Sequence, residues 1–333
     1  MTSKHQYLIC PSCKMEVIED VMQGSFSRYL KCSSCGRAYP IYDGIPILSK
    51  RTWVNGIDYQ NPQWPLLERK REAEISQRLS LNDAFLLELP FPSHRVDTTF
   101  QFKNGAMGYN YFDVITRLDL KGTEKILDVA SGACWTSYHF ASKGCQVVAT
   151  DQCTIKYWGL RSILSYTKKV GEKLQGVCCD FDPLPFKDNY FDIIFMNNSF
   201  QYVKNVSQFL KEIKRIVTKN GKFVLSWTGS RGLLKSNKWG PGHLISKNVN
   251  AAKKKGFVIE SLFIPSSLFV SLMDDRNPHF VLSKIGRFLS PIWNNSSNIR
   301  FIFNKFFHMP VSVFIGLPFN LIASVCDSTR EKR

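Results

Sequence analysis

Two pairs of cysteines near the N-terminus have the spacing that most clearly implies chemistry. They follow the pattern Cys-x2-Cys-x18-Cys-x2-Cys, which is typical of a zinc ion held tetrahedrally by four thiolates. A site with four protein ligands is closed to substrate, so we expect a structural role for the metal. Residues 1–48 are too few to fold on their own core, so the metal would contribute much of the folding free energy. The expected zinc ligands are Cys10, Cys13, Cys32 and Cys35.

A second set of residues follows strand-like runs in the middle of the chain. The run 126–135, ILDVASGACW, ends in small residues, which allow a ligand to approach the backbone closely. Asp151 ends the next run, where a carboxylate can accept hydrogen bonds from a ribose diol, and Asp180 ends the third. Features in this order predict a nucleotide pocket at the carboxyl ends of parallel strands.

Alternation of strands and helices is the pattern that would position these residues. Helices are expected at 135–143, 155–170 and 206–217, and an earlier charged helix over about 65–80. Helices of this length between strands predict right-handed crossovers and an α/β fold with a doubly wound, mostly parallel, Rossmann-like sheet. The expected strands are 125–131, 146–150, 176–180, 191–198, 222–227, 256–264 and 320–326.

The stretches from about 105 to 264, and the last strand near 320–326, resemble class I S-adenosylmethionine-dependent methyltransferases of the type-11-like group. Leu184-Pro185-Phe186 and Phe191-Asp192 are the most specific part of the resemblance. It implies S-adenosyl-L-methionine as cofactor, with the ribose on Asp151. Asp128 has the alternative role of holding the turn, and Asp192 is expected to make local hydrogen bonds. The implied cofactor-binding residues are Asp128, Ala130, Gly132, Trp135, Asp151, Asp180, Phe181 and Asn198.

Two positions depart from the family's glycine-rich turn. Ala130 and Cys134 stand where the family usually has glycine. The extra methyl of Ala130 is tolerable where that residue does not need a positive φ, whereas Cys134 is expected to narrow the turn. Trp135 could then pack over the methionine portion of the cofactor.

The stretches LICPSC and YLKCSSCGRAYPIYDGIPIL resemble a different family, the small zinc-ribbon subunits that activate tRNA and protein methyltransferases. The resemblance implies a β-rich zinc ribbon that packs on a methyltransferase, here within one chain. We therefore divide the chain into a ribbon (1–48), a helical linker (49–104), the cofactor domain (105–264), an insertion (265–319) and a final strand with tail (320–333).

Charge and apolar residues are concentrated in the last third. The net charge is +17, and residues 231–333 hold 15 Lys/Arg against 5 Asp/Glu. Residues 306–326 contain no Asp, Glu, Lys or Arg, but Pro310, Gly316 and Pro318 interrupt that run. We therefore favour a hydrophobic, basic lobe at 265–319 over a spanning helix. The unpaired spacing of the other cysteines and the absence of a signal-like start indicate a cytoplasmic protein, with peripheral membrane contact through this lobe.

Methyl transfer needs positioning above all, and a general base only where the acceptor must lose a proton. The candidate catalytic residues are Asn198, Tyr202 and His243. The lobe favours a small-molecule, lipid-linked or saccharide acceptor. The ribbon and the charge leave a tRNA or rRNA methyltransferase as an alternative, although residues 1–100 are nearly neutral. The altered turn leaves a second alternative, a catalytically degenerate binding protein.

Overall fold

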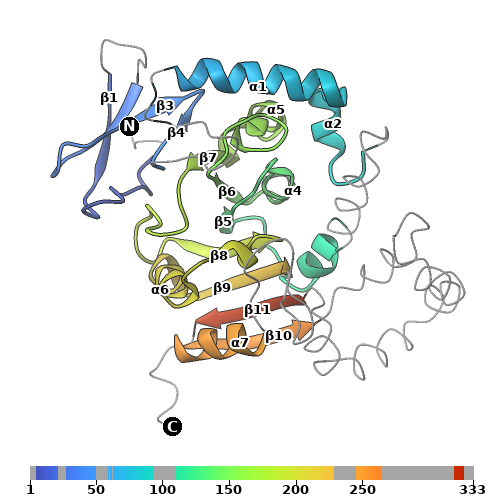
Figure 1. The fold of residues 1–333 in the computed structure, drawn as a ribbon. Helices are drawn as coiled ribbons and strands as arrows, with labels where there is room; N and C mark the ends of the chain where they lie inside the picture. Colours follow the sequence, from blue (N-terminus) through green and yellow to red (C-terminus); the bar gives the residue numbers. More distant parts are fainter. Residues whose placement is uncertain are drawn as a thin grey trace, which may run out of the picture.

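A seven-stranded sheet forms the centre of the molecule (Figure 1). The computed structural model describes residues 5–21, 28–49, 59, 61, 63–92, 108, 110–228, 245–263 and 319–325. The strand order is β10-β11-β9-β8-β5-β6-β7, and β11 alone runs antiparallel to its neighbours. The predicted α/β fold with a mostly parallel sheet is confirmed. The strands are β5 (Lys125–Val129), β6 (Gln146–Asp151), β7 (Leu174–Cys178), β8 (Phe191–Asn197), β9 (Val217–Thr228), β10 (Phe257–Phe263) and β11 (Phe319–Val325).

Helices cover both faces of the sheet because successive strand residues point to opposite sides. Ile126 packs toward α4 (Trp135–Ser142) and α5 (Ile163–Val170), whereas Leu127 packs toward α6 (Val206–Ile216) and α7 (Ile245–Lys254). Helix α6 begins where the Asn205 side chain accepts a hydrogen bond from the Gln208 N–H at 3.0 Å. Helix α5 starts later than expected, since a turn and a short 3-10 helix occupy the preceding residues.

An N-terminal unit, residues 5–49, carries a separate antiparallel sheet. Its strands are β1 (Val17–Val21), β2 (Arg28–Cys32), β3 (Ala38–Tyr42) and β4 (Ile45–Pro46), paired in that order. Backbone pairing joins this unit to the large sheet at two places. Leu8 forms an antiparallel bridge with Phe186, and Ile47 forms a parallel bridge with Cys178. Isolated backbone bridges therefore connect the N-terminal unit to the sheet domain, while the two sheets remain separate.

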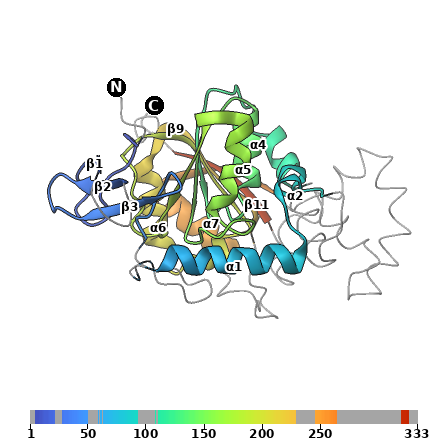
Figure 2. The ribbon, with the colours of Figure 1, turned by 90° about the horizontal axis from the view of Figure 1, so that it is seen from above.

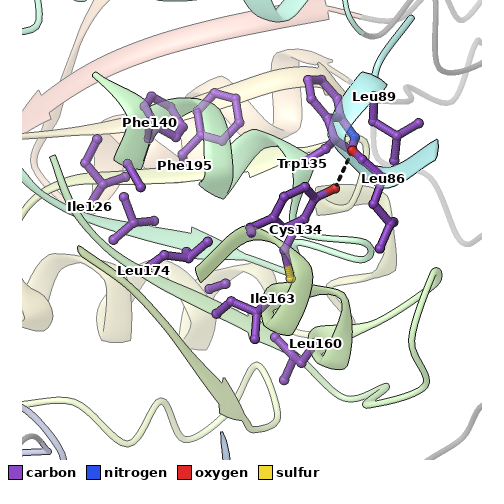
Figure 3. Packing of buried hydrophobic residues seen from close by; sticks show 14 of the residues in the cluster. Leu86, Leu89, Ile126, Cys134, Trp135, Phe140, Leu160, Ile163, Leu174 and Phe195 are labelled. Atoms are coloured by element: carbon purple, nitrogen blue, oxygen red, sulfur yellow. Dashed lines mark hydrogen bonds between the residues drawn. The ribbon is translucent and has the colours of Figure 1, made fainter. Parts of the chain in front are cut away.

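The region expected as a linker packs closely on the sheet domain. Figure 2 shows α1 (Trp64–Leu79) running along one flank of the molecule from the N-terminal strands to α2 (Asp83–Glu88). Trp64 and Phe85 are almost completely buried in the same core as α4 and α5. Figure 3 shows Leu86 and Leu89 beside Trp135 in this core. The helices are thus a structural layer of the domain.

No helix among the described residues is long and apolar enough to cross a membrane. The insertion expected at 265–319 lies, except for its last residue, outside the described residues.

Candidate functional site

The turn after β5 holds three residues in the left-handed region. Ala130, Gly132 and Cys134 have φ values of +54°, +52° and +59°. Ala130 does need a positive φ, so its methyl costs about 1 kcal/mol relative to glycine. The Cys134 side chain is fully buried in the core (Figure 3), and its effect on the width of the turn stays a prediction. Its thiol donates a hydrogen bond to the Gly132 carbonyl at 3.3 Å, which stabilises the turn from its core side.

Asp151, the last residue of β6, ties this turn to the neighbouring strand. Its Oδ2 accepts from the Gly132 N–H at 3.0 Å, and its Oδ1 accepts from the Cys153 N–H at 2.8 Å. Burial raises the pKa of this carboxyl, and the backbone donors oppose the shift. The carboxylate lies beside the turn, as the strand pattern predicted, while its contact with a ribose stays a prediction.

Asp128 lies beneath the same turn and is fully buried. Its Oδ2 accepts hydrogen bonds from Thr136 Oγ1 and Ser137 Oγ, both at 2.5 Å. Burial raises the pKa of Asp128 to about 6. These contacts match the alternative role, in which Asp128 holds the turn and the start of α4. A contact with the cofactor stays a prediction.

A cavity of about 300 Å³ opens at this edge of the sheet. It lies where the turn after β5, the loop after β6, the end of β8 and the residue after α2 come together. Trp135 forms part of the wall, while its contact with the methionine portion of the cofactor stays a prediction, and Trp158 is 40% exposed. The lining is mostly apolar or small, which suits a ligand with extensive apolar surface. The lining residues are Leu89, Ala130, Ser131, Gly132, Ala133, Trp135, Thr136, Tyr157, Trp158 and Asn197.

Of the two asparagines that end β8, Asn197 lines the cavity. Its Oδ1 is buried and has no hydrogen-bond partner among the described residues. Asn198, the predicted candidate, has φ +51° and is held by Gln201, whose amide donates to Asn198 O at 2.7 Å and Oδ1 at 3.2 Å. The sequence pattern located the strand end but not which asparagine faces the cavity. A buried, unsatisfied amide oxygen was a signal that only coordinates could give.

Of the other two predicted catalytic residues, only Tyr202 is among the described residues. Tyr202 is 38% exposed in a short 3-10 helix and is not among the lining residues. His243 lies outside the described residues. The catalytic assignments of Asn198, Tyr202 and His243 therefore stay predictions.

Asp180 and Phe181 follow β7, next to the Asp151 strand. Asp180 Oδ1 accepts from Ser49 Oγ at 3.0 Å and also from Gln152 Nε2. Phe181 meets Phe209 of α6 edge to face, with ring centroids 5.8 Å apart. Neither residue lines the cavity, so their contact with the cofactor stays a prediction.

The LPF and FD residues have structural roles. The Ile9 N–H donates to Pro185 O at 2.9 Å, and Tyr7 stacks on Phe186 with centroids 6.2 Å apart. Asp192 Oδ2 accepts from the Lys125 N–H at 2.9 Å, so this bond joins two strands of the sheet and is not the local hydrogen bond that was expected. This segment thus forms one of the two backbone contacts between the N-terminal unit and the sheet domain, the one that includes the Leu8–Phe186 bridge.

The four predicted zinc ligands converge, with all four sulfurs within 4.8 Å of one another. The Cys10–Cys35 and Cys13–Cys32 sulfurs are 3.7 and 3.4 Å apart. A tetrahedral ion with Zn–S bonds of about 2.3 Å requires sulfurs about 3.8 Å apart, whereas a disulfide requires about 2 Å. The donor set and its spacing therefore fit a zinc ion.

Hydrogen bonds to the sulfurs of Cys10 and Cys32 favour the thiolate form of these two cysteines. Burial raises the pKa of Cys10, but the Tyr39 hydroxyl, 3.1 Å from the sulfur, and backbone donors outweigh it and lower the pKa to about 6. The pKa of Cys32 is also lowered, since backbone and thiol donors outweigh burial. The Met15 N–H lowers the pKa of Cys13, but hydrogen bonding with Cys32 and burial outweigh it and raise that pKa to about 11. A lowered pKa is what metal-binding sulfurs need at neutral pH, and Cys10 and Cys32 show it.

Comparison with known proteins agrees with this fold. Residues 127–225 match the methyltransferase domain family. An uncharacterised protein of Methanocaldococcus jannaschii is 28% identical over 138 residues, which are 41% of this chain and 60% of the relative. A demethylmenaquinone methyltransferase of Streptomyces avermitilis is 29% identical over 113 residues, 34% of this chain and 46% of the relative. The chain therefore spans about half the length of these two curated relatives.

Among solved structures, the [4+2]-cyclase SpnF superposes with a TM-score of 0.50 at 15% identity. The match covers 78% of this chain and 94% of that one. At this identity the likeness concerns the fold alone. Residues 127–225 thus resemble a methyltransferase domain in sequence and fold, and the chemistry must be argued from the site.

Proposed function

We propose that this protein is an S-adenosylmethionine-dependent methyltransferase with a small-molecule, lipid-linked or saccharide acceptor. The observation that carries the proposal is the cavity at the strand ends, where the left-handed turn is fixed by Asp151. Backbone N–H and carbonyl groups in such a turn can lie against a ligand without intervening side chains. The cavity therefore offers a preformed place for an extended, amphipathic cofactor.

The residues present fit the methionine half of that cofactor. Trp135 and Leu89 give the cavity apolar walls, and the buried Asn197 Oδ1 offers an acceptor that nothing described in the protein satisfies. An unsatisfied buried acceptor costs about 1–3 kcal/mol, which a ligand donor would recover. Asp151 and Asp180 would hold the adenosine half at the adjoining strand ends.

Bound S-adenosylmethionine supplies a methyl group activated by its sulfonium. Transfer of that group is an in-line displacement, so the protein contributes chiefly by orientation and by excluding water. The fixed turn would orient the cofactor, and the aromatic walls would exclude water. No described acid or histidine lines the cavity, so the proposed chemistry relies on positioning.

The acceptor class is inferred from the lining and from relatives. Trp158 and Leu89 would favour an apolar or ring-bearing acceptor over a polynucleotide. The names of the Streptomyces relative and of a Caenorhabditis elegans sterol 4-C-methyltransferase, 30% identical over 56 residues, also specify small lipid-like acceptors. Peripheral membrane contact through 265–319 remains part of the proposal, as does a structural zinc ion on the four cysteines.

Calorimetry with S-adenosylmethionine is the direct test. We expect one site per chain, and zinc-loaded protein that binds none would leave only the degenerate alternative. Transfer of labelled methyl into a fractionated cell extract then identifies the acceptor. Label in lipid or in small or saccharide material supports the proposal, whereas label confined to RNA would establish the tRNA or rRNA alternative.

A further inference from the structure

We propose that Ser49 of the N-terminal unit is a positioning residue for purine recognition, acting through Asp180. Ser49 and Gln152 both donate to Asp180 Oδ1, so Oδ2 is the oxygen that would accept from the ligand. The inference rests on the proposed function, since the ligand is the adenosine half of the cofactor. It makes the N-terminal unit part of the cofactor site in addition to a folding support.

The end of the N-terminal unit is fixed to the large sheet next to Asp180. Ile47 bridges Cys178, and the N–H groups of Leu48 and Ser49 both donate to Cys178 O, at 2.8 and 3.1 Å. Ser49 is only 7% exposed. Its hydroxyl then lies 3.0 Å from Asp180 Oδ1. The backbone contacts therefore fix the position of the Ser49 hydroxyl in the absence of a ligand.

The second donor to Asp180 is held by the segment that follows the N-terminal unit. The hydroxyl of Tyr59 donates to Gln152 O at 2.8 Å and lies 3.1 Å from Thr154 Oγ1. Thr154 Oγ1 in turn donates to Glu68 of α1. The loop after β6, which presents Gln152, is therefore anchored by residues outside the sheet domain.

The position of Asp180 determines which ligand group it can meet. Asp151 pairs with Cys178 and its carbonyl accepts from the Cys179 N–H at 3.2 Å, so Asp180 lies two residues beyond the strand partner of Asp151, at the same edge of the sheet. A carboxylate only accepts hydrogen bonds, and the purine of adenosine offers one donor group, its 6-amino group. With both described partners on Oδ1, Oδ2 is the oxygen available for that amine.

Two ligands that differ at this group provide the test. S-adenosylhomocysteine carries the 6-amino donor, and S-inosylhomocysteine carries an oxygen there. The probe is calorimetric affinity of the full-length, zinc-loaded protein for each. We expect the wild type to prefer the adenosine ligand at least about tenfold, because an unmet charged acceptor is costly.

Ser49→Ala should reduce that preference about three- to tenfold by weakening the adenosine ligand alone. Ser49→Thr, which keeps a hydroxyl, should restore it. Ser76→Ala is the matched control. It also removes a serine hydroxyl that donates a hydrogen bond, but Ser76 lies on α1 and its hydroxyl donates to Leu81 O, at 2.8 Å, and not to Asp180. Asp180→Ala should abolish the preference, and adding Ser49→Ala to it should change nothing further.

An unchanged ratio in Ser49→Ala overturns the inference. So does equal weakening of both ligands, because that would reveal a general loss of structure. Wild-type protein that binds neither ligand refutes the proposed function itself. Wild-type protein that binds both equally refutes only the role of Asp180 and Ser49.

Discussion

Glu68 is a buried acid whose ionisation should oppose folding at neutral pH. It sits on α1 and is 1% exposed. Its Oε1 accepts from Thr154 Oγ1, and its Oε2 has no partner among the described residues. Burial raises the pKa of Glu68 from 4.5 to about 7, against the opposing effects of Thr154 and Arg161. The folded protein therefore binds this proton more tightly than the unfolded chain does.

The change we consider is Glu68→Gln, which keeps the shape and removes the charge. A raised pKa stabilises the folded state below pH 4.5, and that contribution is lost as the pH rises to about 7. A difference of 2.5 pKa units at about 1.4 kcal/mol each corresponds to about 3 kcal/mol. We expect the variant to match the wild type near pH 4.5 and to exceed it by up to about 3 kcal/mol at pH 8.

Urea unfolding at intervals between pH 4.5 and 8, with zinc present, measures this difference. Taking variant minus wild type cancels the titration of the cysteines and of Asp128, whose pKa is also raised by burial. Glu74→Gln is the control, since Glu74 lies on the same helix with its side chain 50% exposed. Parallel pH curves for wild type and Glu68→Gln would refute the reasoning, as would a variant that is less stable at pH 8.

Three further predictions concern the cavity, the turn and the metal. Asn197→Leu should lower the affinity for S-adenosylhomocysteine about tenfold in calorimetry, since the cavity loses its unsatisfied acceptor; unchanged affinity would place Asn197 outside the cofactor site. Ala130→Gly should raise the free energy of unfolding in urea by about 0.5–1 kcal/mol, because glycine adopts φ +54° freely; a loss would show that the methyl packs favourably. Metal analysis should find one zinc ion per chain. Removing the zinc with a chelator should make the backbone amides of β1–β3 exchange their hydrogens faster, and amides that stay protected after zinc removal would contradict a metal-dependent fold.

The sequence predicted the sheet well because the evidence for each strand is local. Runs such as 191–198 combine apolar residues with boundaries at polar ones, and the structure places β8 at Phe191–Asn197. The cysteine spacing likewise predicted the convergence of four sulfurs. In both cases neighbours along the chain determine the outcome.

The side chains of the turn and cavity were predicted less well, because their orientation depends on contacts between distant segments. Asn197 and Asn198 are adjacent and chemically identical, and only the φ of +51° at Asn198 and its bond to Gln201 separate them. The orientation of Cys134 also depends on contacts between distant segments, since its side chain is buried where α4 packs on the sheet. Leu89 reached the cavity wall from a segment that the pattern presented as a linker.

The charged contacts between segments argue against treating the sequence boundaries as folding boundaries. Arg161, 4% exposed, pairs with Asp43 of the N-terminal unit at 2.8 Å and also with Glu72 of α1. Glu212 of α6, also buried, pairs with Lys14 at 3.1 Å. Each buried charge has a second partner, since Glu212 also pairs with Arg215 at 2.9 Å, so these charges are satisfied by several segments at once. Charged contacts therefore hold the N-terminal unit, α1 and the sheet domain together, and this explains how a residue as distant in sequence as Ser49 lies beside Asp180 at the edge of the sheet.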